Sequence, residues 1–351
     1  MATRLMKKLL LLLASAALCV MACRHTGEGE VSTYAGNGRI GSVNGIKDSA
    51  TFSNLMGLAV DSGNNIYVAD SRNNLIRKIS ADGVVSTLAG SGKTGTADGK
   101  GTSASFFFPT AIAVDAHGVV YVADTQNSLV RKVMPDGTVT TIAGRPSPEI
   151  EKNRDTVAKL NRPYGIAVDK NDNVYVSDWE RDMIKKISPD GKITAFAGTG
   201  HKGIKDGKGS EASFYLPQGL AIDQQGNLYV ADTYNNMIRK ITPDGMVSTL
   251  AGMIAKGSAD GKGKEALFAH PDGLAVDRKG NIFVADVGNN KIRKITPEGT
   301  VTSIAGARKR GADNGPLNTA TFNRPYGVTV DNAGSIYVAD YLNNVVRKIS
   351  L

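Results

Sequence analysis

The tripeptide Val68-Ala69-Asp70 is the first of six equivalent tripeptides in this chain, each placed 54 residues after the one before it. The other five are Val122-Ala123-Asp124, Val176-Ser177-Asp178, Val230-Ala231-Asp232, Val284-Ala285-Asp286 and Val338-Ala339-Asp340. A fixed period of this length is typical of solenoids and propellers, in which each repeat completes its core only against its neighbours. Six periods account for 324 of the 351 residues, so the folded part is expected to consist of repeats alone, over residues 31–351.

Each repeat carries four short segments rich in β-branched and aliphatic residues, here called strands a, b, c and d. In the second repeat they are Ala111–Val114, Val119–Ala123, Leu129–Val133 and Val139–Gly144. Turn-forming residues such as Pro135-Asp136-Gly137 separate them, as antiparallel hairpins require. Units of four short antiparallel strands are typical of propeller blades, so the pattern predicts an all-β, six-bladed β-propeller with four-stranded blades.

The two ends of the chain predict how the ring closes. The last repeat stops at Leu351, directly after strand c, and therefore lacks its own strand d. The segment Val31–Gly36 reads VSTYAG and matches the d strand Val85–Gly90, which reads VSTLAG. We expect this N-terminal strand to complete the last blade, which would remove an exposed strand edge.

The repeat resembles a known family. The segment Pro271–Ile295 contains Pro-x-Gly-Leu-Ala-Val-Asp, then Gly-Asn-Ile-Phe-Val-Ala-Asp, then Asn-Asn-Lys-Ile-Arg-Lys-Ile, and it is similar to the NHL repeat. The resemblance recurs six times over about 320 residues and implies a six-bladed propeller. It does not fix the function, because NHL-repeat proteins include RNA-binding, protein-binding, lyase and sensor members.

The N-terminal segment resembles an export signal. Residues 1–8 are basic and residues 9–22 are apolar, a combination that predicts a signal peptide over 1–22. The residues Val20-Met21-Ala22-Cys23 resemble a bacterial lipobox, which implies lipidation of Cys23 and a lipid-anchored linker over 23–30. The alternative is that Cys23 simply follows an ordinary cleavage site. Arg24 follows the cysteine, which by resemblance favours the outer membrane, facing either the periplasm or the cell surface.

The charge of the chain gives little support to a nucleic-acid partner. The net charge of +9 falls to +6 when the leader, with its three basic residues, is removed. One basic doublet per repeat is spread around the ring rather than gathered into a patch: Arg77-Lys78, Arg131-Lys132, Lys185-Lys186, Arg239-Lys240, Arg293-Lys294 and Arg347-Lys348. A weakly basic, exported chain lacks the electrostatic footprint of a phosphate-backbone binder, so no nucleic acid is expected.

Acidic residues that recur in every repeat are interpreted as structural. The aspartate that ends each b strand, such as Asp70, is expected to accept hydrogen bonds from nearby backbone and hold the turn that follows. The segments Asp98–Gly101, Asp206–Gly209 and Asp260–Gly263 each offer one carboxylate followed by Gly and Lys. A calcium loop needs several oxygen ligands, so these segments are interpreted as turns, and no metal or cofactor is predicted.

Candidate binding residues are sought where the repeats differ. The d-to-a and b-to-c connections share one face of a propeller, called the top face here, and the d-to-a loops are long. The third and sixth repeats alone have Arg-Pro-Tyr at the end of this loop together with an aromatic residue after the b strand. The predicted ligand-binding residues at the top of the channel are Arg162, Tyr164, Trp179, His270, Asp272, Arg324, Tyr326 and Tyr341. The alternative is that these aromatic side chains only plug the channel.

Two functions remain open. Arginine and aromatic side chains suit planar or anionic ligands, which favours a monomeric, non-catalytic scaffold that binds a glycan, a peptide or an envelope protein. The alternative is a lyase or a lactonase-like enzyme with its site at the channel mouth. Related propeller enzymes hold a metal with several His or acidic ligands, whereas this chain has four histidines, of which only His270 is expected near the channel. No catalytic residues are therefore assigned.

Overall fold

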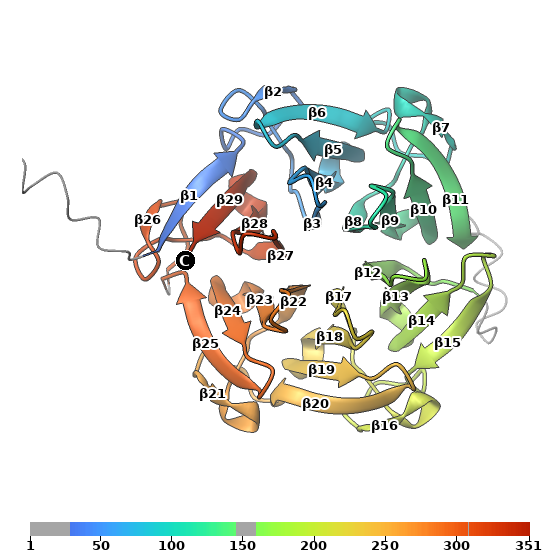
Figure 1. Ribbon diagram of the computed structural model, residues 1–351, viewed down its shortest axis with the longest axis vertical. Helices are drawn as coiled ribbons and strands as arrows, with labels where there is room; N and C mark the ends of the chain where they lie inside the picture. Colours follow the sequence, from blue (N-terminus) through green and yellow to red (C-terminus); the bar gives the residue numbers. More distant parts are fainter. Residues whose placement is uncertain (1–28, 145–158, 308) are drawn as a thin grey trace, which may run out of the picture.

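The computed structural model describes residues 29–144, 159–307 and 309–351, and these form a six-bladed β-propeller (Figure 1). Each blade is an antiparallel sheet whose strands follow one another outward from a central channel. The fold class, the number of blades and the order of strands a to d are as the repeat predicts.

The strands have equivalent positions in all blades. The a strands, which line the channel, are β3 (Leu58–Val60), β8 (Pro109–Val114), β12 (Pro163–Val168), β17 (Leu220–Ile222), β22 (Pro271–Val276) and β27 (Pro325–Val330). The b strands are β4 (Ile66–Asp70), β9 (Val120–Asp124), β13 (Val174–Asp178), β18 (Leu228–Asp232), β23 (Ile282–Asp286) and β28 (Ile336–Asp340). The c strands are β5 (Leu75–Ile79), β10 (Leu129–Val133), β14 (Met183–Ile187), β19 (Met237–Ile241), β24 (Lys291–Ile295) and β29 (Val345–Ser350). The d strands are β6 (Val84–Ala89), β11 (Thr138–Gly144), β15 (Ile193–Ala197), β20 (Met246–Gly252), β25 (Thr300–Ala305) and β1 (Glu30–Ala35).

Short 3-10 helices form two sets of connections. The b-to-c connections on the top face are η1 (Ser71–Asn73), η3 (Thr125–Asn127), η5 (Trp179–Arg181), η7 (Thr233–Asn235), η9 (Val287–Asn289) and η10 (Tyr341–Asn343). Three d-to-a loops contain η2 (Gly101–Ser103), η6 (Gly209–Glu211) and η8 (Gly263–Glu265).

Five blades have a fifth strand that the sequence pattern did not predict. These two-residue strands pair with the outside of strand d: β2 (Gly45–Ile46), β7 (Gly99–Lys100), β16 (Gly207–Lys208), β21 (Gly261–Lys262) and β26 (Gly315–Pro316). Three of them lie in the Asp-Gly-Lys-Gly segments, so the interpretation of those segments as turns alone was wrong. In the described part of the third blade the sheet has four strands.

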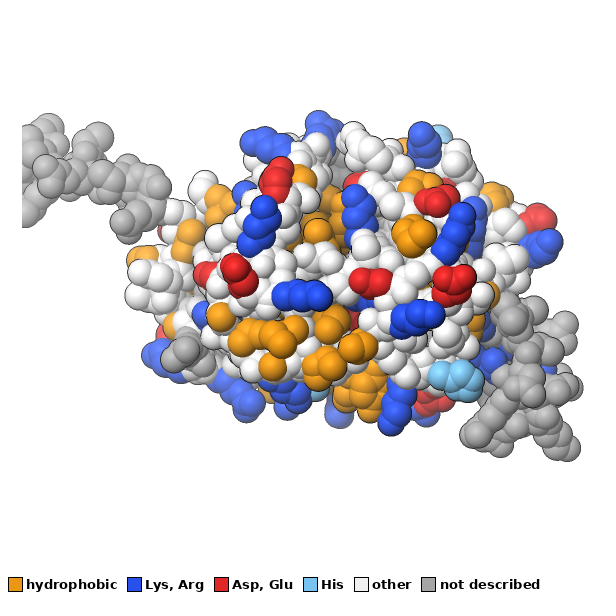
Figure 2. All heavy atoms as spheres, turned by 90° about the horizontal axis from the view of Figure 1, so that it is seen from below, with side chains coloured by type: hydrophobic (Ala, Val, Ile, Leu, Met, Phe, Trp, Pro, Cys, Tyr) orange, Lys and Arg blue, Asp and Glu red, His pale blue; other side chains and the backbone are white. Residues whose placement is uncertain are grey.

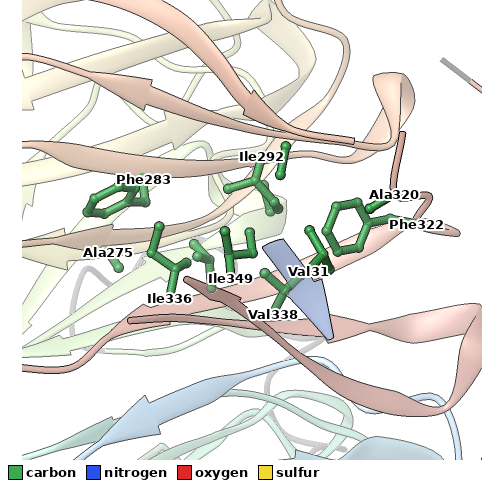
Figure 3. Close-up of a cluster of buried hydrophobic side chains, with 12 residues drawn as sticks. Val31, Ala275, Phe283, Ile292, Ala320, Phe322, Ile336, Val338 and Ile349 are labelled. Carbon is green, nitrogen blue, oxygen red and sulfur yellow. The ribbon is translucent and has the colours of Figure 1, made fainter. Parts of the chain in front are cut away.

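The core lies between neighbouring blades. Every b strand is buried along its whole length, because its sheet packs against another blade on each side. Figure 3 shows one such cluster, in which Phe283 and Ile292 of the fifth blade lie near Ile336 and Val338 of the sixth. Val31 of β1 belongs to the same cluster. The repeats therefore cannot complete their cores singly, as the period implied.

The ring closes through its two ends. Strand β1 pairs antiparallel with β29, with Val31 opposite Ile349 and Thr33 opposite Arg347, and its other edge pairs with β26. Figure 1 shows β1 beside β29, although they stand at opposite ends of the chain. The predicted closure is confirmed. Among the residues described, no helix has both the length and the apolar character needed to cross a membrane.

The basic doublets do not lie on the surface as pairs. The first residue of each doublet is fully buried: Arg77, Arg131, Lys185, Arg239, Arg293 and Arg347. Each forms an ion pair with the aspartate that ends its own b strand, at distances from 2.6 to 2.9 Å. The doublets are spread around the ring, but only the second residue of each is partly exposed. On the rim seen in Figure 2, Lys and Arg side chains are interspersed with Asp and Glu.

These buried aspartates stabilise each blade internally, as their recurrence predicted. Oδ1 of Asp232 accepts a hydrogen bond from the N–H of Tyr215 at 2.8 Å, and Oδ2 accepts one from the Asn235 amide at 2.8 Å. Burial raises the pKa of Asp232 to about 6, against the effect of Arg239, so the carboxylate is ionised at neutral pH. In five blades the aspartate thus fixes both the b-to-c turn and the preceding loop. In the third blade Arg181 replaces the turn asparagine, and Asp178 accepts from the loop N–H of Asn161.

Neighbouring blades are also joined at the top face. The residue that follows each b-to-c helix has a left-handed backbone, and its side chain accepts a hydrogen bond from a backbone N–H of the next blade. Five of these bonds end on an Asn or Asp oxygen, at 2.6 to 2.9 Å, whereas Oγ of Ser128 accepts the one from Arg162 at 3.4 Å. These bonds place the loops that carry the candidate site.

Candidate functional site

The residue before each loop-ending proline, or before Leu55 in the first blade, is held in an unfavourable backbone conformation. His270 has a φ of 50° and Arg324 a φ of 55°, and their N–H groups donate to Asn236 and Asn290 of the preceding blades. The left-handed region is costly for non-glycine residues, by ~1–2 kcal/mol. Glycine would relieve this cost, yet no blade uses it here: the six residues are Asn54, Phe108, Arg162, Leu216, His270 and Arg324. Three of them, Arg162, His270 and Arg324, belong to the predicted ligand-binding residues.

A pocket of about 270 Å³ lies on the top face beside the channel, over the fourth to sixth blades. Four predicted site residues line it, namely His270, Asp272, Arg324 and Tyr326. The remaining lining residues are Gln218, Thr233, Tyr234, Val287, Gly288 and Arg310. The structure thus brings half of the predicted set into one concave site.

Asp272 is the central polar group of this site. Its side chain also borders a cavity of about 50 Å³ within the channel, where Tyr164 reaches it from the third blade. The Tyr164 hydroxyl donates a hydrogen bond to Oδ2 at 3.2 Å, and no ion pair to Asp272 is present among the described residues. Only 5% of Asp272 is exposed, and burial raises its pKa to about 7. A buried carboxyl group with a single polar partner is a frequent mark of a functional site.

The sixth blade presents an arginine and a pair of tyrosines. The rings of Tyr326 and Tyr341 pack edge to face with their centroids 4.9 Å apart, which fixes the orientation of Tyr326 beside the pocket. Within the described residues, the side chain of Arg324 has no hydrogen bond or ion pair. Its guanidinium group is therefore free to meet a ligand.

The third blade has the same residue types but a different arrangement. Arg162 forms an ion pair with Glu180 of its own blade at 2.8 Å, and the Glu180 carboxylate also accepts from Asn161. The rings of Tyr164 and Trp179 lie 6.0 Å apart. The charge of Arg162 is thus compensated, so this blade contributes Tyr164 to the channel rather than a second free cation.

His270 lies between a lysine and a tyrosine. Nε2 of His270 is 2.7 Å from Nζ of Lys256, and its ring packs edge to face against Tyr234 at 5.1 Å. Burial and the Lys256 ammonium group hold the pKa of His270 below its usual range. The neutral ring accepts a hydrogen bond from Lys256 and adds no charge of its own. In the described residues no three His, Cys, Asp or Glu side chains are grouped so as to hold a metal ion.

Arg310 and Tyr234 are two of the six pocket residues that were not among the predicted site residues. Arg310 follows two other basic residues in the loop before the sixth blade, and Tyr234 occupies the second position of η7, where other blades have non-aromatic residues. The basic run at Arg310 and the aromatic residue at position 234 are both visible in the sequence. The equivalent positions vary among the other repeats, so the sequence did not indicate that either side chain faces the pocket. Cys23, the predicted lipidation site, lies outside the described residues.

Asp272→Asn is expected to stabilise the protein above pH 7. The ordinary pKa of Asp is 3.8 and the folded value is about 7, so the wild type loses stability as pH rises through this interval. At ~1.4 kcal/mol per pH unit the loss amounts to about 4 kcal/mol, which Asn, having no charge to bury, avoids. Urea unfolding at pH 4 and pH 8 measures both proteins. Equal stabilities at pH 8 would contradict the burial of an ionisable carboxyl group.

Comparison with known proteins supports the repeat family and the fold. Three family models match: an NHL repeat at residues 268–295, a teneurin NHL domain at 200–260, and an SMP-30/gluconolactonase/LRE-like region at 17–152. Protein SUPPRESSOR OF QUENCHING 1, chloroplastic, from Arabidopsis thaliana is 30% identical over 267 residues, which are 71% of this chain. The chain spans 25% of that relative's own length.

Solved structures share the propeller fold. An auxiliary nutrient binding protein from Bacteroides thetaiotaomicron superposes with a TM-score of 0.72 and 18% identity, over 92% of this chain and 76% of that one. A gluconolactonase from Xanthomonas campestris superposes with a TM-score of 0.60 and 15% identity, over 93% and 90% of the two chains. At these identities the likeness concerns the fold alone.

Proposed function

Because the chain is an NHL-repeat protein folded as a six-bladed β-propeller, we propose that it is a non-catalytic binding scaffold whose ligand enters the top-face pocket. The observation that carries this proposal is the pocket itself. It combines the free guanidinium groups of Arg324 and Arg310 with two tyrosine rings and the buried Asp272. A concave site with a few converging polar groups is the usual form of a small-ligand site.

The arrangement of His270 favours binding over catalysis. His270 would be the candidate base of a lyase or lactonase, yet its Nε2 accepts from Lys256, and no described hydrogen bond joins it to Asp272. A general base needs access to the proton it removes. The proposal of a scaffold is further supported by the auxiliary nutrient binding protein that shares this fold.

We expect loss of ligand binding when the pocket is altered. Arg324→Ala and Tyr326→Ala remove the cation and the ring that we assign to ligand contact, and each should weaken binding by about 10- to 100-fold, as anchor residues do. Arg72→Ala removes an exposed arginine from the top face of the first blade and is the control. Glycan and peptide arrays identify the ligand, and titration calorimetry measures the variants.

Hydrogen exchange, measured with and without the ligand found on the arrays, tests which face of the propeller binds it. The ligand should protect residues around His270 and Arg324. Protection of the a-to-b turns instead, such as residues 61–65, would place the ligand on the opposite face and contradict the proposal.

The protein is proposed to be exported and tethered to the bacterial outer membrane. The basic and apolar leader, the lipobox-like residues before Cys23 and the Bacteroides protein of shared fold support this location. A tether at residue 23 would leave residues 24–29 as a linker before β1. Monomeric behaviour is part of this proposal.

Cys23→Ser is expected to release the protein from the membrane. The serine hydroxyl group cannot carry the thioether-linked lipid. Without the lipid the protein loses the membrane affinity that the anchor provides. Detergent phase separation of cell extracts measures the change, and mass spectrometry detects the acyl group on the wild type. Equal membrane binding of both proteins, with no acyl mass on Cys23, would contradict lipidation.

A further inference from the structure

The pocket over the fourth to sixth blades has an uneven distribution of charge. Arg310 and Arg324 both line it, and Lys256 lies at its edge, hydrogen-bonded to His270. Asp272, on the channel side, is its only acidic lining residue. Neither arginine side chain has a hydrogen bond or an ion pair with another described residue. The sixth-blade side of the pocket thus suits an anion, because a guanidinium fork binds a planar carboxylate through two parallel hydrogen bonds.

The fourth and fifth blades contribute polar groups with little exposure to solvent. Asp272 is 5% and Gln218 is 8% exposed, and the Thr233 hydroxyl is buried as well. The Thr233 hydroxyl donates to the carbonyl of Pro271, so its lone pairs remain free to accept. Asp272 uses one oxygen for Tyr164 and leaves the other for a ligand. Buried polar groups of this kind favour binding of a ligand whose hydroxyl groups hydrogen-bond to them. A ligand that leaves these groups unpaired binds more weakly.

Two aromatic rings flank these polar groups. Tyr234 is 41% exposed at the edge of the pocket, and Tyr326 is fixed by its contact with Tyr341. Tyrosine offers an apolar face with a polar tip, which suits the C–H face and the hydroxyl rim of a sugar ring. The volume of about 270 Å³ lies just below the range of ordinary ligand pockets, ~300–1,000 Å³, and fits a small ligand.

From these three features we propose that the pocket binds a monosaccharide unit that carries a carboxylate, such as a uronic acid. The carboxylate pairs with Arg324 and Arg310, the ring lies against Tyr234 or Tyr326, and the hydroxyl groups reach Asp272, Gln218 and Thr233. This inference rests on the proposed function and specifies the ligand class of the same site.

The burial of Asp272 agrees with this assignment. Its raised pKa reflects the unfavourable free energy of burying an ionised carboxyl group in the folded protein. Residues that reduce stability are characteristic of binding and catalytic sites. A ligand hydroxyl would supply the hydrogen bond that the folded protein lacks.

Three matched sugars test the proposal on the full-length mature protein. Galacturonic acid, galactose and galactose 6-phosphate share a hexose ring and differ in the group at carbon 6. By calorimetry at pH 6.5, we expect galacturonic acid to bind at least 10-fold more tightly than galactose. Arg324→Gln and Arg310→Gln should each weaken galacturonic acid binding by at least 10-fold. Arg72→Gln, an exposed top-face arginine outside the pocket, should leave it unchanged.

The outcomes separate this inference from the proposed function. Equal binding of galactose and galacturonic acid, or no effect of Arg324→Gln, would overturn the carboxylate assignment. Tighter binding of galactose 6-phosphate would replace it by a phosphate site. If none of the three sugars binds at about 10 mM, the assignment of a monosaccharide ligand is wrong. The proposed function is then still tested separately by the array experiment. Unchanged melting temperatures establish that each variant is folded.

Discussion

Deletion of residues 31–36 is expected to unfold most of the protein at room temperature. The deletion removes nearly all of β1, which pairs with β29 and β26 and closes the sixth blade. Val31 packs against the fifth and sixth blades, whereas Ala35 and Tyr34 pack in the cluster that contains Phe52 of the first blade. One strand therefore seals the core on both sides of the closing blade.

The magnitude follows from burial and the hydrogen-bond ladder. A buried aliphatic side chain contributes ~1.5–3 kcal/mol and each ladder hydrogen bond ~0.5–1.5 kcal/mol, so losing the strand should cost at least about 5 kcal/mol. Whole domains have only ~5–15 kcal/mol of stability. Circular dichroism during urea unfolding measures the loss.

Two further samples make the deletion test specific. Thr33→Ala changes an exposed side chain of the same strand and should alter stability by no more than ~0.5 kcal/mol. A synthetic peptide of residues 29–38 added to the truncated protein should pair with β29 and restore much of the melting temperature. A truncated protein that melts like the wild type would show that the ring does not depend on this closure.

Arg239→Met is expected to reduce stability by ~3–5 kcal/mol, because it leaves a buried carboxylate without its partner. Nη1 of Arg239 donates to Asp232 at 2.7 Å and to the Ser213 carbonyl at 3.1 Å. Nη2 donates to the Lys205 carbonyl at 3.0 Å and to Asp206 at 2.6 Å. One guanidinium group thus joins strand c, strand b and the preceding loop.

The chain contains natural controls for this prediction. The third blade uses Lys185 at the equivalent position, where Nζ lies 2.6 Å from Asp178 and donates to the carbonyl of Lys159. Arg239→Lys should therefore lose less than Arg239→Met, since a lysine can keep the ion pair. Lys240→Met, one residue further along, changes a partly exposed side chain and should be close to neutral. Urea unfolding measures the free energy of unfolding of the three variants. An Arg239→Met value within about 1 kcal/mol of the wild type would refute the role assigned to the buried arginine.

The fold was predictable from sequence because one signal was repeated six times. The period set the number of blades, and the match between residues 31–36 and the d strands set the closure. The buried arginines could not be predicted in the same way. Arg239 and Lys240 are adjacent cations in the sequence, and only the packing of one blade on the next determines which of them points inward. The outer strands of two residues were too short to leave a periodic pattern.

The site was predictable in its location and not in its details. Differences between repeats pointed to His270, Asp272, Arg324 and Tyr326, which do meet in one pocket. The repeated Arg-Pro-Tyr motif suggested that Arg162 and Arg324 were equivalent, but Glu180 compensates the first alone. The hydrogen bond from Tyr164 to Asp272 joins residues 108 positions apart and depends on side-chain reach across the channel. A repeat pattern predicts where each residue lies in its blade. It does not predict which side chains of different blades form hydrogen bonds with each other.

The contact between the second and third blades contains the longest of the six bonds that join neighbouring blades at the top face, the 3.4 Å bond from the N–H of Arg162 to Ser128. It also contains two shorter bonds, because the hydroxyl groups of Thr110 and Thr125 donate to the carbonyls of Tyr164 and Pro163 at 2.7 Å. One weak contact is thus compensated by its neighbours, and opening the disc between these two blades requires several bonds to break together.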